Sequence, residues 1–89
     1  MIEISTSMDP IGLANRLCDL LLGSEARCHP DPAVGDSVWM VGSGNNTWLK
    51  KIASGTYRLH FRTPVSEPRL RALVVLINWR IGGAVARIL

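Results

Sequence analysis

Residues 56–62, TYRLHFR, alternate apolar and polar side chains without a break. Successive side chains of an extended strand point to opposite faces, so Tyr57, Leu59 and Phe61 share one face. The opposite face carries Arg58, His60 and Arg62. This alternation is typical of a strand with one buried face and one open face.

Two further strands are expected on the N-terminal side of this one. Residues 37–41, SVWMV, and 47–53, TWLKKIA, are apolar or alternating runs bounded by turn formers. The links between the strands, GSGNN at 42–46 and Ser54-Gly55, are short. Because short links join antiparallel neighbours, the three strands predict a meander.

A helix is expected before the meander. Asp9 can accept hydrogen bonds from free amides, and Pro10 fits the first helical position. Apolar residues then repeat at helical spacing up to residue 22, and Gly23 is a plausible stop. Ile2 and Ile4 alternate with polar residues and predict a short edge strand ahead of this helix.

A second, long helix is expected to follow the meander to the end of the chain. Ser66 would cap it, with Glu67 and Pro68 in its first turn. The predicted fold is a single α+β domain over residues 1–89: an N-terminal helix, a three-stranded antiparallel meander and a C-terminal helix packed on the sheet.

The predicted C-terminal helix has two apolar sides. At about 100° per residue, one side forms a stripe that we expect to lie on the sheet: Leu70, Leu73, Val74, Ile77, Ile81, Ala84, Val85 and Ile88. The opposite side is also apolar, where a surface helix would be charged. It carries Ala72, Val75, Leu76, Trp79, Gly83 and Ala86.

Such a helix needs a second surface to pack against, either the first helix or another chain. A large apolar side chain left in water lacks about 1.5–3 kcal/mol of the stabilisation that its full burial would give. The small residues allow close approach, and a tryptophan with flanking arginines is typical of binding hot spots. We predict contact with a protein partner or a second copy (a homodimer) through that second side, with Arg80 and Arg87 at the rim.

The charge of the chain is asymmetric along the sequence. Residues 1–36 hold two basic and six acidic side chains, whereas residues 37–89 hold eight basic and one acidic. This pattern is consistent with a bipolar surface that steers charged partners, or with two halves that attract each other within one fold.

The basic outer face of the meander predicts an alternative function, binding of DNA or RNA. The residues expected to line it are Trp48, Lys50, Arg58, His60 and Arg62. Outward basic side chains on a small sheet can enter a major groove. Residues 48–74, about a third of the chain, resemble the arm-site-binding domain of tyrosine recombinases in their tryptophan, the run GTYR at 55–58 and FRT at 61–63. The resemblance assigns no residue role.

The sequence offers little for catalysis or for holding a cofactor. Cys18, Cys28, His29 and Asp31 lack the close pairing of structural zinc ligands. Adjacent Cys28 and His29 are poorly placed to form a nucleophile and its base. The glycines at 42 and 44 lead into a strand, whereas phosphate loops lead into a helix. We therefore expect no enzyme, no metal and no other cofactor.

The N-terminus lacks a basic segment followed by an apolar run, which indicates a cytoplasmic protein with reduced thiols. The longest uncharged run of the C-terminal stretch, residues 72–79, is too short to span a bilayer. The expected function is that of a small non-enzymatic interaction protein. It would be an accessory or inhibitory factor of the kind that phages and mobile elements encode.

Overall fold

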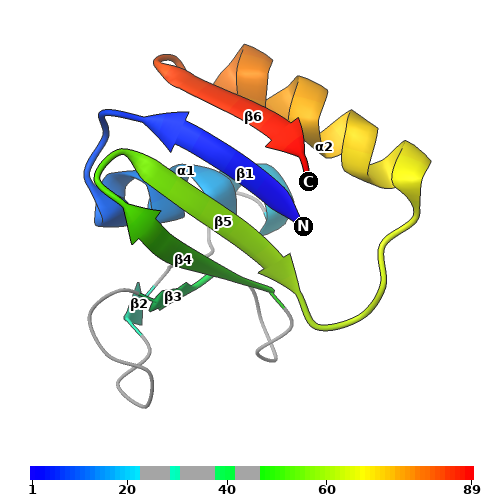
Figure 1. The fold of residues 1–89 in the computed structure, drawn as a ribbon, viewed down its shortest axis with the longest axis horizontal. Coiled ribbons are helices and arrows are strands. Elements are labelled where there is room, and N and C mark those ends of the chain that lie inside the picture. Colours follow the sequence, from blue (N-terminus) through cyan, green and yellow to red (C-terminus); the bar gives the residue numbers. More distant parts are fainter. Residues whose placement is uncertain (23–28, 31–37, 42–46) are drawn as a thin grey trace.

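The computed structural model describes residues 1–22, 29–30, 38–41 and 47–89. The elements follow in the order β1 (Ile2–Thr6), α1 (Pro10–Leu22), β2 (His29–Pro30), β3 (Val38–Met40), β4 (Thr47–Ala53), β5 (Thr56–Phe61), α2 (Glu67–Arg80) and β6 (Ala84–Ile88). The strands form one sheet, and the helices lie behind it in the view of Figure 1.

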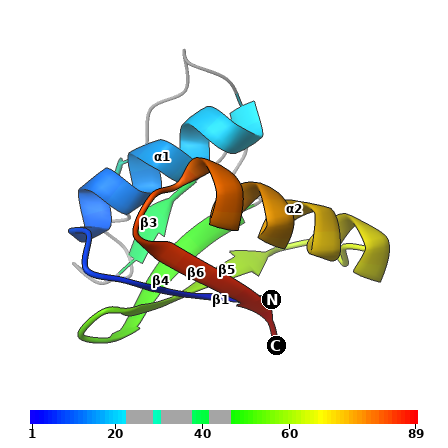
Figure 2. The ribbon, with the colours of Figure 1, turned by 90° about the horizontal axis from the view of Figure 1, so that it is seen from above.

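The sheet has the strand order β2-β3-β4-β5-β1-β6, and every neighbouring pair is antiparallel. Both helices lie on the same side of it (Figure 2), so no helix of the described residues covers the opposite face. The α+β class is confirmed, and the predicted meander is present as β3, β4 and β5.

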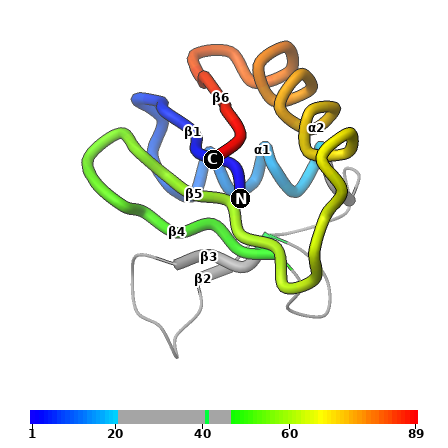
Figure 3. The backbone as a smooth tube through the Cα atoms, turned by 45° about the vertical axis from the view of Figure 1, so that its right-hand side comes forward, coloured from blue at the N-terminus to red at the C-terminus, as the bar shows by residue number. Residues whose placement is uncertain are grey.

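The two ends of the chain add strands β1 and β6 to the meander. β1 lies between β5 and β6, so the predicted strand at residues 2–4 exists but is internal rather than an edge. Leu89 N donates to Met1 O at 3.1 Å, and the two ends of the chain lie side by side (Figure 3). If β2 and β3, which lie between α1 and β4 in the chain, are set aside, the remaining elements follow in the order β1-α1-β4-β5-α2-β6. Their strand order in the sheet is β4-β5-β1-β6, which is a split βαβ arrangement.

The first helix starts where the sequence predicts. Asp9 Oδ2 accepts a hydrogen bond from Gly12 N at 3.3 Å, which satisfies one of the free amides of the first turn. The side of α1 toward the sheet is fully buried and consists of Leu13, Ala14, Leu17 and Cys18. Gly23, the predicted stop, lies outside the described residues.

The second helix starts at Glu67 as predicted, after Ser66 at the N-cap position, although Ser66 makes no side-chain capping bond. The prediction that it continues to residue 89 is wrong, because α2 ends at Arg80. Gly82 and Gly83 follow, and Gly83 has a φ of 80°, which favours glycine. The chain then reverses into β6, where buried Ala84 and Ala86 alternate with exposed neighbours.

The core lies between the helices and the inner face of the sheet. Its fully or nearly buried apolar side chains come from both terminal strands, both helices, the meander and the residues that directly follow β3 and α2: Ile2, Ile4, Leu13, Ala14, Leu17, Cys18, Val41, Leu49, Tyr57, Leu59, Ile77, Ile81, Ala84 and Ala86. In the described part of the chain, no helix combines the length and apolarity needed to cross a bilayer.

Candidate interaction surfaces

The outward side of α2 is exposed, and we name four of its residues, Ala72, Val75, Leu76 and Trp79, the docking face. The exposed fractions are 74% for Trp79, 65% for Val75 and 37% for Leu76. α1 lies on the same side of the sheet as α2 (Figure 2) and leaves this face in solvent. The monomer therefore does not bury the second apolar side of the helix.

Arg80 lies beside the docking face and contacts its largest member. The Arg80 guanidinium carbon is 4.9 Å from the centroid of the Trp79 ring, within the range of a cation–π contact. Exposed Gly83 lies in the turn that follows α2. Both predicted residues thus remain close in sequence to the face, at its C-terminal end.

Two of the predicted partner-binding residues do not belong to the helix surface. Ala86 lies in β6 and is only 5% exposed, and Arg87 is on the outer face of the sheet, where it binds Glu3. Their assignment to the second side of one helix is therefore corrected. The cause is the end of α2 at Arg80, after which the two-residue period of β6 replaces the helical one.

The outer face of the sheet brings together most of the residues predicted for nucleic-acid binding. The register places Trp48 opposite His60 and Lys50 opposite Arg58 on adjacent strands. Arg62 is exposed but follows the last residue of β5 and takes no part in this block. We name Trp48, Lys50, Arg58, His60 and Arg87 the basic sheet face.

Glu3 lies within this face and was not predicted as a site residue. It accepts hydrogen bonds from Arg87 Nη2 at 2.7 Å and Nε at 3.1 Å, and Arg58 Nε lies 3.5 Å from its second oxygen. The hydrogen bond from Arg87 holds the pKa of Glu3 below the ordinary 4.5. The charges of Arg87 and Arg58 act in the same direction, whereas burial opposes them.

Sequence reasoning missed this cluster because its members are far apart in the chain. Glu3 and Arg87 are separated by 84 positions, and each is paired only because β1 lies between β5 and β6. The available signal was the alternation of residues 84–88, AVARI, which fits a strand as well as a helix.

Trp48 and His60 form the aromatic part of the basic sheet face. Their ring centroids are 5.6 Å apart and the ring planes differ by 5°, which is a stacked arrangement. Burial lowers the pKa of His60 below the ordinary 6.5, and the positive charges of Lys50, the N-terminus and Arg58 lower it further. Both effects favour the neutral imidazole.

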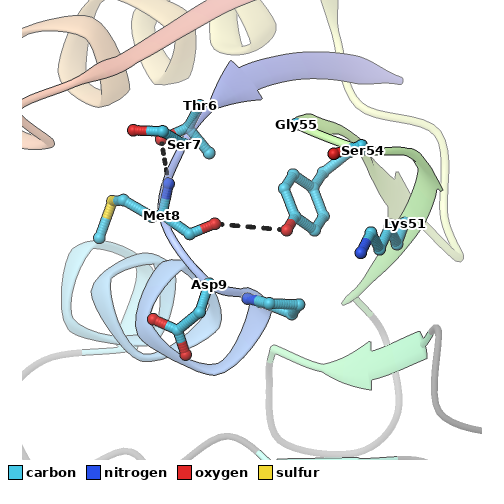
Figure 4. Close-up of a pocket in the computed structure, with 9 residues that line it drawn as sticks. Thr6, Ser7, Met8, Asp9, Lys51, Ser54 and Gly55 are labelled. Carbon is cyan, nitrogen blue, oxygen red and sulfur yellow. Dashed lines mark hydrogen bonds between the residues drawn. The ribbon is translucent and has the colours of Figure 1, made fainter.

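A pocket of about 520 Å³ lies between the start of α1 and the β4–β5 turn (Figure 4). The Tyr57 hydroxyl donates to Met8 O at 3.4 Å, and Asp9 binds the first turn of α1. Burial raises the pKa of Tyr57, with the charge of Asp9 acting in the same direction. Among the described lining residues, Asp9 and Lys51 are the only acid and base, so the pocket offers no pair of carboxylates for acid–base catalysis.

The cysteine chemistry differs from the prediction. Cys18 is fully buried and is disulfide-bonded, so the expectation of reduced thiols is wrong for this residue. The other potential metal ligands considered above, Cys28, His29 and Asp31, have no described side chains. Within the described ranges, no group of three or more His, Cys, Asp or Glu side chains is placed to hold a metal ion.

Comparisons of the chain with protein-family models, with curated proteins and with solved structures found no match. The function is therefore inferred from the docking face and the basic sheet face.

Proposed function

We propose that this chain is a non-enzymatic interaction protein that pairs with a second copy of itself through the docking face. The observation that carries the proposal is the 74% exposure of Trp79 next to Val75 and Leu76. Each large apolar side chain left in water forfeits about 1.5–3 kcal/mol relative to burial. A contact that covers these three side chains recovers this free energy.

The spacing of the docking face favours a second copy as the occupant. Ala72 and Trp79 are seven residues apart, about two turns, and so lie on the same side of α2. A two-fold axis near Val75 and Leu76 places two α2 helices antiparallel, with Trp79 of each copy against Ala72 of the other. The largest side chain then meets the smallest, as a self-complementary interface requires.

The charges beside the docking face set the salt dependence of this pairing. At about 100° per residue, Arg69 and Arg80 lie on one flank of α2, and Arg71 on the other is paired with Glu67 at 2.7 Å. A two-fold axis brings each flank against the same flank of the second copy. Arg69 and Arg80 of one copy therefore lie near Arg80 and Arg69 of the other, and these positive charges repel. Because salt screens this repulsion, the dimer should strengthen as salt rises.

Sedimentation equilibrium of the full chain tests the proposal. Association costs on the order of 4–15 kcal/mol, so the expected dimer is weak, with a Kd on the order of micromolar. The double variant Trp79→Ala/Leu76→Ala should be a folded monomer by circular dichroism. Ile11→Ala removes an apolar side chain from α1 whose 54% exposure lies between those of Leu76 and Trp79, and it is the matched control, which should dimerise normally.

Two results would overturn the proposal. One is a native chain that stays monomeric well above that Kd at both low and high salt. The other is a dimer that the double variant leaves intact, since another surface would then form it.

A further inference from the structure

A row of charged side chains crosses four strands on the outer face of the sheet. Lys50 pairs with Arg58, Arg58 pairs with Glu3, and Glu3 pairs with Arg87 in the strand register. Adjacent strands lie about 4.8 Å apart, so the row is about 14 Å long. It contains three basic groups and one acid.

Glu3 does not neutralise this row. Its carboxylate is engaged mainly by Arg87, whose side chain is still 70% exposed. Arg58 shares the same carboxylate through an ion pair, with its Nε 3.5 Å from the second oxygen, so one acid faces two arginines, and Lys50 is exposed. A net positive charge therefore faces solvent along the row.

The stacked pair of Trp48 and His60 lies directly beside the row. Trp48 precedes Lys50 by two residues on β4, and His60 follows Arg58 by two residues on β5, so each pair shares the outer face. Two residues of a strand span about 6–7 Å. Flat aromatic rings and positive charge therefore adjoin within one small block.

We propose that the basic sheet face binds single-stranded nucleic acid, with phosphates on the charged row and an unpaired base stacked against Trp48. Aromatic rings beside a basic track are the two components of sequence-tolerant binding to single strands. Duplex bases are already stacked on both sides and must be extruded before they can reach a ring. An acidic peptide would satisfy the charges but would leave the ring pair unused.

The basic sheet face is separate from the docking face, so nucleic-acid binding and dimerisation can be tested independently. Trp48, Lys50, Arg58 and His60 come from β4 and β5, whereas the docking face is on α2. The Trp79→Ala/Leu76→Ala chain can therefore serve as a monomeric background in which nucleic-acid binding is measured.

Fluorescence anisotropy with a labelled oligothymidine tests the proposal at about 50 mM salt. Contact with three phosphates predicts a slope of log K against log salt of about −2. Lys50→Ala should weaken binding roughly 5- to 10-fold and reduce that slope by about 0.7. Trp48→Ala should weaken binding roughly 5- to 100-fold through lost stacking.

Glu3→Gln provides a test in the opposite direction. It keeps an acceptor oxygen for Arg87 but removes the negative charge from the row, so binding should tighten by a factor similar to that lost in Lys50→Ala. Arg16→Ala removes an exposed positive charge from α1 and is the matched control, which should bind as the native chain does. Circular dichroism and thermal melting establish that each variant is folded.

Several results would overturn the proposal. Absence of oligothymidine binding at this salt, or tighter binding of a duplex of the same length, would do so. If Arg16→Ala weakened oligothymidine binding as much as Lys50→Ala does, the net charge of the chain rather than the basic sheet face would explain the binding. Equally tight binding of labelled polyglutamate would show that the surface selects acidic polymers rather than bases.

Discussion

Asn78 and Ala86 are joined by two hydrogen bonds that connect the last helix to the outer edge of the last strand. Asn78 Nδ2 donates to Ala86 O at 3.2 Å, and Ala86 N donates to Asn78 Oδ1 at 2.6 Å. The side-chain amide thus occupies the backbone groups that an added strand would use. An edge whose backbone groups are engaged in this way is less open to pairing with a strand of another chain at Ala86.

Asn78→Ala should destabilise the chain and open this edge. The substitution removes both partly buried hydrogen bonds to the Ala86 backbone, and a typical intramolecular hydrogen bond contributes about 0.5–1.5 kcal/mol. Urea unfolding should show that loss, and light scattering should show new association. A variant within about 0.5 kcal/mol of the native chain would mean that water replaces the amide freely.

Glu3 should make the stability of the chain sensitive to acid. Its pKa is lower in the folded chain than the ordinary 4.5, so the folded state favours the carboxylate. The resulting stabilisation is present above pH 4.5 and is lost as pH falls through the folded-state pKa. Urea unfolding above and below these pKa values should show a lower free energy of unfolding on the acid side. Glu3→Gln should abolish the share of that pH dependence that the Glu3 carboxylate contributes.

His60 should add a second pH dependence at higher pH. Its pKa is below 6.5 in the folded chain, so the unfolded chain takes up the proton first as pH falls. The free energy of unfolding should therefore be full above pH 6.5 and decrease below it, until the folded-state pKa is reached. An NMR titration of the imidazole measures that pKa directly, and a value above 6.5 would contradict this prediction.

Reduction of the disulfide at Cys18 should destabilise the chain. Removing a native disulfide from a small domain costs about 2–5 kcal/mol. Cys18→Ser removes the bond from the fully buried side and should lower the melting temperature at least as much as dithiothreitol does. Mass spectrometry of the unreduced monomer checks the bond, and free thiols in a native, air-oxidised sample would argue against it.

Most elements of this fold could be predicted from local patterns. The alternation at residues 56–62, the Asp9-Pro10 helix start and the start of the second helix after Ser66 each lie within a few neighbouring residues. The end of α2 could not be placed by the same means. Residues 81–88 satisfy a helical stripe as well as a strand, and the strand is formed because β1 supplies its hydrogen-bonding partners.

The candidate surfaces divide in the same way. The apolar outer side of α2 follows from helical periodicity alone, since Ala72, Val75, Leu76 and Trp79 are close in sequence. The basic sheet face required the register of four strands, which sets Glu3 between Arg58 and Arg87. The spacing of apolar residues along the sequence determines which side of a helix or strand is apolar. Pairing between residues as much as 84 positions apart is settled by the folded core, because those contacts exist only when the distant segments pack together.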